Sequence, residues 1–310
     1  MAFDLIFPRA SKFSLASGVI KTSEDDFYVK EIMQVEMSGE GEHVWLWVEK
    51  IGQNTEFVAG QIADFANVKK MDVGFSGQKD RWAKTQQWFS VYLGSKVEPD
   101  WQAFEVENVS ILEAKRHSKK LRRGEHQSNY FNIFIRNLAD SASLEKSLIE
   151  IQGKGFPNYF GPQRFGRKGA NLERGERFFN GEIKASRSQR SFYLSAARSY
   201  LFNLNLAKAV KDDTWIENEI GGPLYGDAQD GVAPLSAHEQ YILEHHAIFA
   251  KGIHKNRLKL ERRPYCIVPE NMSWEFEGED LRLSFTLPKG IFATALLAEA
   301  CEFKTALGEN

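Results

Sequence analysis

The segment His43–Lys50 (HVWLWVEK) alternates between two sets of side chains, and this period of two predicts a strand with two partly buried faces. Asn54, a good N-cap, predicts the start of a helix whose apolar residues recur at helical spacing as far as Lys69 and Lys70. Further short strands are predicted at Gly18–Thr22, Asp26–Glu31, Met71–Phe75, Gln87–Leu93, Asn108–Ala114, Phe131–Asn137 and Leu281–Leu287.

The composition of the chain changes at Gly155, where a glycine-rich stretch precedes a region that is predicted to be largely helical. Further helices are predicted at Ser143–Gln152, Ser191–Val210, from Ser236 onward and at Ala293–Glu302. Ser236 and Glu239 match a capping box. Because strands precede and follow the helical region, the sequence predicts an α+β domain, residues 1–154 plus 264–310, interrupted by an inserted domain, residues 155–263.

The composition is typical of a folded protein, since 42% of the 310 residues are apolar and 13% are aromatic. A net charge of -2 excludes a uniformly basic nucleic-acid coat, so any contact with a polyanion must come from local clusters. The two cysteines, Cys266 and Cys301, predict neither a disulfide framework nor a metal pair, which fits a reducing compartment. With no leader pattern and no apolar run of membrane-spanning length, we expect a soluble cytoplasmic protein without membrane contact.

Asp80 lies at the centre of Gly74–Val91 (GFSGQKDRWAKTQQWFSV), between two cations and just after glycines that let a ligand approach the backbone. The flanking strands place Asp80 on a loop at a strand end, where catalytic groups often reside. Asp80 is therefore the candidate catalytic carboxylate. The alternative is an exposed acid that caps a turn.

Positive charge is concentrated in two stretches. Lys115–Arg123 holds six Lys or Arg in nine positions and no acid. Such a run is either a solvated turn or a polyanion contact, since a phosphate backbone would relieve the repulsion between its charges. The stretch Gly155–Asn171 contains both aromatic residues and the cations Arg164, Arg167 and Lys168, interleaved along the sequence.

Two apparent motifs lack a required residue. Gly161–Gly166 has the spacing of a phosphate-binding loop, but Arg167 and Lys168 stand where Lys and Ser or Thr are required. His238 and Glu239 match the first two residues of the zinc-protease helix motif, but the second histidine of that motif is absent. The sequence therefore predicts no metal site and no nucleotide cofactor.

Seven motifs occur in an order and spacing that resemble the tRNA pseudouridine synthase D (TruD) family, from about Phe27 to Glu299. They read DFYVKE, GEHVWLWVEKIGQNT, GFSGQKDRWAKTQQWFSV, KLRRGEHQSNYF, PNYFGPQRFGRKGANL, SFYLSAARS and LPKGIFATALLAE. The resemblance implies an enzyme that isomerises uridine 13 of certain tRNAs to pseudouridine without a cofactor. It also implies a pseudouridine-synthase catalytic domain, with a mixed, largely antiparallel sheet and flanking helices, interrupted by an inserted α/β TRUD domain.

The resemblance also implies roles for individual residues. The family's nucleophilic aspartate falls on Asp80, and its uridine-contacting positions fall on Phe27, Asn129 and Phe292. Ser128 departs from the family pattern, which often has glycine there, and the insertion is short for a bacterial member.

These residue types fit the chemistry of the family. Pseudouridine formation breaks the bond from ribose C1′ to base N1 and rejoins the base through C5. A carboxylate suffices, as a nucleophile at a sugar or base carbon or as a base at C2′, and the sequence leaves these routes open. The target base must leave its stack, and stacking on an aromatic face returns about 1 to 3 kcal/mol of that cost. Phe27, Phe131 and Phe292 are candidates for stacking, with a core position as the alternative for each, and the Asn129 amide can pair with a pyrimidine edge.

Cations are expected to stabilise the carboxylate or to contact the tRNA backbone. Lys79 and Arg81 flank Asp80 and can favour its charged form. Contacts with the RNA backbone are predicted for Lys79, Arg81, Lys119, Lys120, Arg122, Arg123, Arg164, Arg167 and Lys168.

Two other functions would use many of the same residues. A non-catalytic protein that binds or folds tRNA needs the aromatic and basic side chains but not the carboxylate of Asp80. A nucleosidase-type hydrolase acting on free nucleosides needs the carboxylate but not the basic run. For the synthase we expect tRNA as the partner, no protein partner and a monomer.

Overall fold

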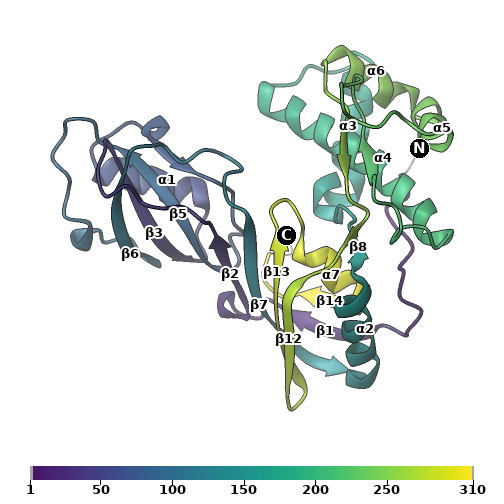
Figure 1. Cartoon of the computed structure of the whole chain (residues 1–310), viewed down its shortest axis with the longest axis horizontal. Helices are drawn as coiled ribbons and strands as arrows, with labels where there is room; N and C mark the ends of the chain where they lie inside the picture. Colours follow the sequence, from purple (N-terminus) through teal and green to yellow (C-terminus); the bar gives the residue numbers. More distant parts are fainter. Residues whose placement is uncertain (1–2, 309–310) are drawn as a thin grey trace. The chain divides into compact units, whose positions relative to one another are not determined.

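The computed structural model describes residues 3–308, which form two compact units (Figure 1). The sheet unit comprises Leu15–Ser141, Pro269–Ile291 and the chain from Cys301 on. The helical unit comprises the chain up to Ser14, Ala142–Val268 and Phe292–Ala300. The boundaries of the inserted domain at residues 155 and 263 stay a prediction.

All strands of the sheet unit belong to one ten-stranded mixed sheet. They are β1 (Ala16–Ile20), β2 (Phe27–Ile32), β3 (His43–Ile51), β4 (Val73–Phe75), β5 (Lys84–Tyr92), β6 (Val109–His117), β7 (Ser128–Ala139), β12 (Glu270–Glu277), β13 (Asp280–Pro288) and β14 (Cys301–Thr305). The main path runs β12–β13–β7–β2–β5–β3–β6, and β1, β14 and β4 pair off this path. Only the β1–β14 and β2–β5 pairs are parallel among these strands, so the predicted mixed, largely antiparallel sheet is confirmed.

Helix α1 (Thr55–Phe65) covers one face of this sheet near β4 and β5 (Figure 1). Val58 and Ile62 of the helix are fully buried in one core with Leu46 of β3 and Phe89 of β5. Burying each such side chain contributes about 1.5 to 3 kcal/mol. Strand β4, which precedes the Asp80 loop, therefore packs against α1.

The start of α1 was predicted correctly, and its end was not. The Oδ1 atom of Asn54 accepts the Glu56 N–H at 2.9 Å, which confirms the predicted N-cap. The helix ends at Phe65, before Lys69 and Lys70, because Asn67 adopts a left-handed conformation (φ 51°). A left-handed residue, often Asn where Gly is absent, is a common helix stop.

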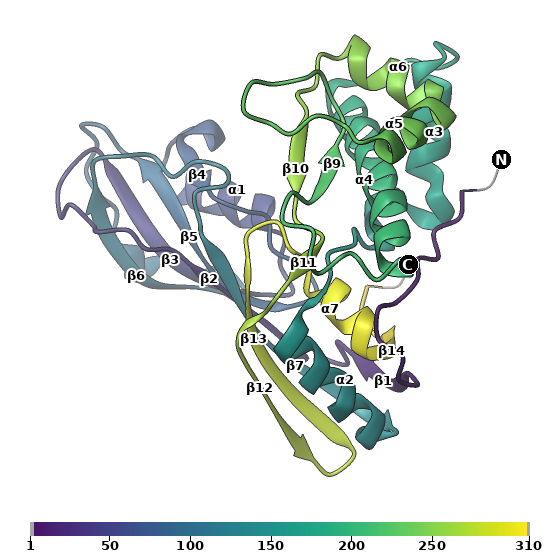
Figure 2. The ribbon, with the colours of Figure 1, turned by 45° about the vertical axis from the view of Figure 1, so that its right-hand side comes forward.

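The helical unit is built around the long helix α4, which packs with α3, α5 and α6 (Figure 2). Its helices are α2 (Ser141–Lys154), α3 (Ala170–Phe179), α4 (Arg187–Lys211), α5 (Ala237–His245), α6 (Ala247–Lys255) and α7 (Ala293–Ala300). Its short strand pairs are β8 (Phe156–Pro157) with β11 (Cys266–Ile267), and β9 (Gly222–Leu224) with β10 (Glu261–Arg263). The capping box of Ser236 and Glu239 at the start of α5 is confirmed. Within residues 3–308, no helix combines the length and the apolar character needed to cross a membrane.

Other elements also differ from the sequence prediction. The helix predicted to reach Glu302 ends at Ala300, because Cys301 begins β14 and pairs with Ala16 of β1. Strand β12 was not predicted; it forms a hairpin with β13, visible beside β7 in both views (Figures 1 and 2). Strand β6 extends to His117, so the basic run begins within a strand rather than in a turn.

Gly74 of β4 lies against the backbone of the basic run, so the sheet leaves no room for a side chain there. A Cβ atom at Gly74 would lie 2.3 Å from the Leu121 carbonyl oxygen and 2.7 Å from the Ser90 hydroxyl oxygen. We expect Gly74→Ala to lower the free energy of unfolding by about 1 to 3 kcal/mol, because the added methyl must push the backbone apart.

The matched control is Gly60→Ala in the middle of α1, where a Cβ atom meets nothing within 4 Å. This change should raise the free energy of unfolding by roughly 0.5 to 1 kcal/mol, since alanine favours the helix. Urea denaturation measures both effects. Equal stability of the Gly74→Ala and wild-type proteins would contradict the predicted close approach.

Candidate active site

Asp80 lies on the loop between β4 and β5, as predicted, and both of its carboxylate oxygens are held by the chain. Oδ1 accepts the backbone N–H of Trp82 at 3.0 Å, and Oδ2 forms an ion pair with the ammonium of Lys21. The Asp80 side chain is 35% exposed, whereas that of Lys21 is 6% exposed. The carboxylate is therefore oriented by the protein and still accessible to a ligand.

Lys21 is a functional candidate that the sequence did not reveal. It follows β1 directly and has a left-handed backbone (φ 56°), and its ammonium lies 4.5 Å from the ring centroid of Phe27. It therefore touches both the candidate catalytic residue and a predicted uridine contact. Its only local signal is a lysine just after a strand, which is too common to identify a site.

A second buried lysine fixes the backbone of the Asp80 loop. The ammonium of Lys50 donates to the carbonyl oxygen of Asp80 at 2.9 Å and to that of Gln53 at 2.8 Å. Burial lowers the pKa of Lys50 to about 8, although the charge of Asp80 opposes this shift. The loop is also held at Lys79, whose backbone N–H donates to the Thr55 hydroxyl at 3.0 Å.

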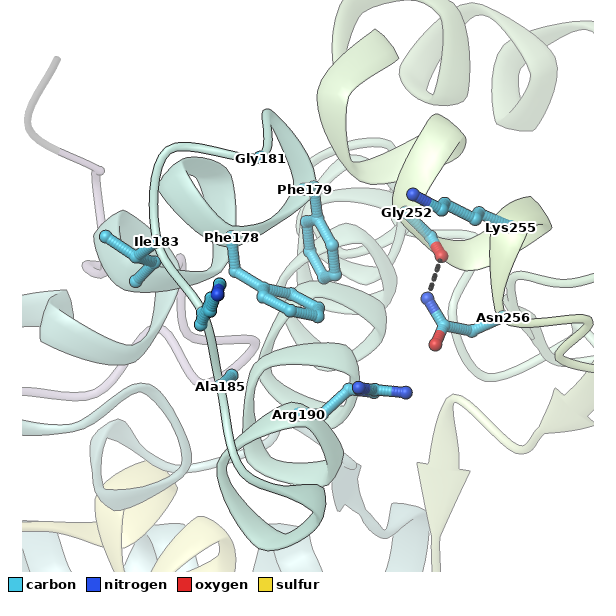
Figure 3. Close-up of a pocket in the computed structure, with 10 residues that line it drawn as sticks. Phe178, Phe179, Gly181, Ile183, Ala185, Arg190, Gly252, Lys255 and Asn256 are labelled. Atoms are coloured by element: carbon cyan, nitrogen blue, oxygen red, sulfur yellow. Dashed lines mark hydrogen bonds between the residues drawn. The ribbon is translucent and has the colours of Figure 1, made fainter.

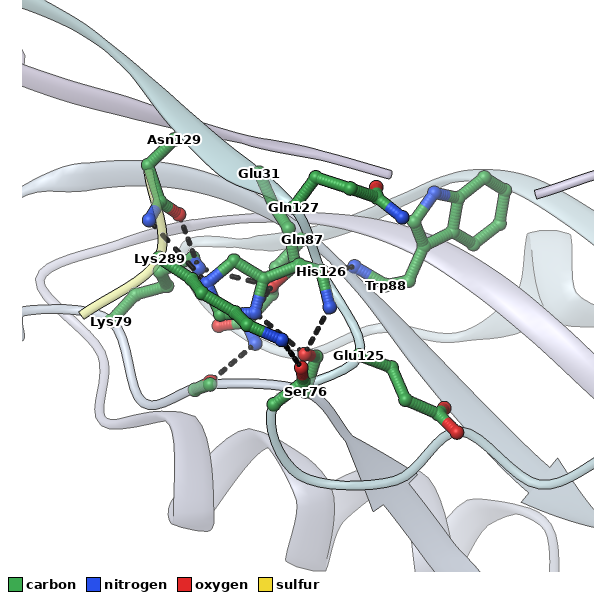
Figure 4. Close-up of polar contacts among 12 residues, drawn as sticks. Glu31, Ser76, Lys79, Gln87, Trp88, Glu125, His126, Gln127, Asn129 and Lys289 are labelled. Carbon is green, nitrogen blue, oxygen red and sulfur yellow. Dashed lines mark hydrogen bonds and ion pairs between the residues drawn. The ribbon is translucent and has the colours of Figure 1, made fainter. Parts of the chain in front are cut away.

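The side chain of Lys79 takes part in a polar network with Glu31 of β2 and Asn129 of β7 (Figure 4). Its ammonium donates to Glu31 Oε2 at 2.9 Å and to Asn129 Oδ1 at 2.7 Å. Glu31 and Asn129 lie opposite each other in the β2–β7 ladder, so the pairing register brings them together. Burial raises the pKa of Glu31, and the ammonium of Lys79 and the N–H of Trp88 oppose this shift.

His126 continues this network on the other side of Asn129 (Figure 4). Its Nδ1 atom lies 2.6 Å from Ser76 Oγ, and its Nε2 atom lies 3.4 Å from Asn129 Nδ2. Burial, followed by the charges of Lys79 and Lys289, lowers the pKa of His126 to about 4. The imidazole is therefore neutral at physiological pH.

The two predicted aromatic residues of the sheet unit occupy neighbouring positions. Phe27 is the first residue of β2 and meets Phe131 of β7 edge to face, with ring centroids 6.3 Å apart. Phe131 stacks on Phe285 of β13 at 5.3 Å. Direct contacts thus connect the predicted residues Asp80, Phe27 and Asn129 through Lys21 and the adjacent Lys79, while Phe131 packs behind Phe27.

Phe292 belongs to the helical unit, where it lies just before α7. Its ring centroid is 6.2 Å from that of Phe160 and 5.6 Å from the guanidinium carbon of Arg164. Arg164 also donates to Ser195 Oγ at 2.9 Å, and burial lowers its pKa. Arg167 and Lys168, by contrast, are exposed.

The basic run forms part of a concave surface on the sheet unit. Lys119, Lys120 and Arg122 line a cavity of about 830 Å³ together with residues of the β2 end and of β3. The Lys120 ammonium donates to the Met71 carbonyl oxygen at 2.5 Å. The Arg123 guanidinium lies 3.7 Å from the Phe75 ring centroid and also pairs with Glu56.

A second basic cavity, of about 540 Å³, lies on the helical unit and was not predicted (Figure 3). The rings of Phe178 and Phe179 line it, and its cations are Lys184, Arg190 and Lys255. These residues come from α3, α4, α6 and the loop after α3. No stretch of sequence is basic enough to mark this cavity, because the fold collects its cations from separate segments.

The described residues 3–308 contain no group of three or more His, Cys, Asp or Glu side chains arranged to hold a metal ion.

The depressed pKa of His126 predicts a loss of stability in acid. Between its ordinary pKa of about 6.5 and its native pKa of about 4, the unfolded chain binds a proton that the native protein does not, so stability falls as the pH is lowered. At pH 5 this amounts to about 2 kcal/mol relative to pH 8. His126→Gln cannot titrate at this position, so its free energy of unfolding should fall by about 2 kcal/mol less between pH 8 and pH 5 than that of the wild-type protein. Urea denaturation at the two pH values measures this difference. Equal pH dependence in both proteins would argue against a neutral native His126.

The family model for tRNA pseudouridine synthase D (TruD) matches residues 9–187, more than half of the chain. The chain is 42% identical over 312 residues to the tRNA pseudouridine synthase D of Cellvibrio japonicus (strain Ueda107), an alignment that covers 96% of this chain and 93% of that protein. It is 37% identical over 337 residues to the tRNA pseudouridine synthase D of Hydrogenovibrio crunogenus (strain DSM 25203 / XCL-2), covering 95% of this chain and 97% of that protein.

The fold has a counterpart among solved structures. A crystal structure described as a putative tRNA pseudouridine synthase D (TruD) from Methanosarcina mazei superposes with a TM-score of 0.70 over 95% of this chain and 96% of that chain, at 18% identity. This likeness supports the predicted pseudouridine-synthase fold. The family resemblance of the seven sequence motifs is confirmed by the family model and the relatives together: the chain belongs to the tRNA pseudouridine synthase D (TruD) family.

Proposed function

We propose that this chain, a tRNA pseudouridine synthase of the TruD family, isomerises uridine 13 of tRNA and that the carboxylate of Asp80 carries the reaction. The observation that supports the role of Asp80 is its setting. Its carboxylate is oriented by Trp82 and Lys21, is accessible, and is one residue from the side chain that holds Asn129.

The isomerisation needs an anionic group beside the sugar and the base. It consumes no co-reactant. The bond from C1′ to N1 breaks, the bond from C1′ to C5 forms, a proton leaves C5 and N1 gains one, so the composition of the RNA is unchanged. The carboxylate of Asp80 acts as a nucleophile at a sugar or base carbon, or as a base at C2′. Lys21 supplies the countercharge in a site shielded from water on the Lys21 side.

The target base is proposed to lie beside Phe27 and Asn129. A contact of Phe292 with the base stays a prediction from the family resemblance. Phe131 stacks on Phe285 and meets the edge of Phe27, so we assign it to the support of Phe27. The Asn129 amide offers one acceptor and one donor to the pyrimidine edge.

The tRNA backbone is proposed to contact cations of the basic run, of the segment after Phe165 and of the Asp80 loop. The exposed members are Arg81, Lys119, Arg122, Arg123, Arg167 and Lys168, and Lys120 is partly exposed. The Lys79 side chain is buried and that of Arg164 is partly buried, each against protein partners, so we assign them to positioning rather than to the RNA backbone. A cytoplasmic location, a monomeric state and the absence of a protein partner stay predictions from the sequence.

Asp80→Asn should abolish the isomerisation without unfolding the protein. Asparagine keeps an oxygen that can accept the Trp82 N–H but lacks the charge, so we expect pseudouridine formation to fall by at least about 1,000-fold. Pseudouridine in a tRNA transcript after incubation measures the effect, and mapping of the modified nucleotide tests position 13.

The matched control is Asp25→Asn, since Asp25 is an acid of the same unit whose side chain is 72% exposed. It should keep wild-type activity. Full activity of a folded Asp80→Asn protein would move the catalytic role elsewhere, and an inactive wild-type protein that still binds tRNA would favour the non-catalytic alternative.

Removing two exposed charges of the basic run should weaken tRNA binding in a salt-dependent way. Lys119→Gln with Arg122→Gln is the cleanest pair, because Lys120 and Arg123 also hold local structure. The slope of log affinity against log salt should fall by about 2, roughly one for each phosphate that the protein no longer neutralises. Arg282→Gln with Lys304→Gln, which removes two exposed charges from β13 and β14, is the control and should leave the slope unchanged. Equal slopes in both double variants would contradict the proposed role of the basic run.

A further inference from the structure

The side-chain amide of Asn129 is held at both ends by protein partners (Figure 4). Asn129 is the second residue of β7, between β2 and β13, and only 8% of it is exposed. Its Oδ1 atom lies 2.7 Å from Lys79 Nζ, and its Nδ2 atom lies 3.4 Å from His126 Nε2. Both atoms of the Asn129 amide therefore have a protein partner, which restricts how the amide can turn.

The Lys79 end determines which amide atom is the oxygen. An ammonium has only donors, so the group that faces Lys79 must be an acceptor. Lys79 cannot turn away, because Glu31 binds the same ammonium at 2.9 Å and is itself fully buried on its side chain. Glu31 is fixed in turn by the Trp88 N–H, which donates to Oε1 at 3.2 Å.

The His126 end accepts from the NH₂ group once Lys79 has fixed the amide oxygen. Because the imidazole is neutral, only one ring nitrogen carries a proton. Nε2 faces the Asn129 NH₂ group and must accept, so the proton lies on Nδ1 and is donated to Ser76 Oγ at 2.6 Å. Ser76 is held in place because its hydroxyl oxygen also accepts the backbone N–H of His126 at 2.8 Å.

We propose that the five residues Ser76, His126, Asn129, Lys79 and Glu31, here named the amide-orienting network, make the site selective for uracil over cytosine. The network leaves Asn129 one free lone pair on oxygen and one free N–H, in a fixed order. Uracil matches that order, because its N3–H donates and the neighbouring carbonyl accepts. Cytosine reverses it, with an acceptor at N3 and an amino donor beside it.

To bind cytosine, the amide of Asn129 would have to turn over. Its NH₂ group would then face the ammonium of Lys79, and His126 would have to move its proton from Nδ1 to Nε2. The contact with Lys79 would change from favourable to repulsive, and a site built to hydrogen-bond one pattern strongly rejects its reverse. Lys79, His126, Glu31 and Ser76 are thus positioning residues that act through Asn129. The proposal rests on the proposed contact between Asn129 and the target base.

The test measures the ratio of two dissociation constants, for a tRNA transcript with cytidine at position 13 and for the same transcript with uridine. All proteins carry Asp80→Asn, so that uridine is not converted during the measurement. Any difference in the cost of extruding the two bases from the RNA is common to all proteins and cancels when their ratios are compared. We expect the protein with an intact network to prefer uridine by at least about tenfold.

Glu31→Gln with Lys79→Met removes the cation that selects the amide oxygen, and it leaves no buried unpaired carboxylate. In this variant the cytidine-to-uridine ratio should fall at least about fivefold, because the amide can turn, while the affinity for the uridine transcript changes little. Lys289→Met is the matched control, since Lys289 lies near His126 and donates to the Gly124 carbonyl oxygen but does not contact Asn129. Its ratio should be unchanged.

Ser76→Ala provides a second, milder test if the double variant does not fold. It removes the hydroxyl that binds both Nδ1 and the backbone N–H of His126, so the imidazole no longer holds the NH₂ end of Asn129 and the ratio should again fall. An unchanged ratio in a folded network variant, or no preference for uridine with the network intact, would overturn the inference. These outcomes are separate from the proposed function, which is tested by pseudouridine formation at position 13 in the protein without Asp80→Asn and by its loss in the Asp80→Asn variant.

Discussion

The ammonium of Lys79 is buried between β2 and β7, and burying a charge costs several kcal/mol unless a counterion and hydrogen bonds compensate. Glu31 supplies the counterion and Asn129 the hydrogen bond, and both are available only when β2 and β7 pair in the observed register. The rest of the site follows from this constraint. Lys79 is adjacent to Asp80, so a strand register that satisfies the buried charge also sets the candidate catalytic loop against the strand that carries Asn129.

Three lysines surround this loop, and each has a different structural role. Lys21 binds the carboxylate of Asp80, Lys50 binds its backbone carbonyl, and Lys79 turns away toward Asn129. Local positive charge therefore orients an acid, anchors the chain and orders an amide. A net charge of -2 for the whole protein conceals this arrangement entirely, because the effect depends on where the cations are buried.

The sequence was informative where one segment carries the signal. Asn54 marked the start of α1, the alternation of His43–Lys50 marked β3, and the Gly-Gln-Lys-Asp-Arg segment marked the candidate catalytic loop. Contacts created by strand pairing could not be predicted in this way. Lys21, which follows β1, forms an ion pair with Asp80, which follows β4. His126 contacts Asn129 and is held near it by Ser76, the residue after β4. The end of α7 was misplaced for a related reason, because an apolar run fits a helix or a strand and only the partner strand β1 decides.

The parallel pairing of β1 with β14 joins the first and last strands among the described residues, with Ala16 opposite Cys301. On the ribosome, β1 emerges long before β14 and must wait for the chain between them before this neighbour exists. During that time one of its edges presents unpaired N–H and C=O groups, which invite pairing with other chains. Such long-range closure is slow to form even after release.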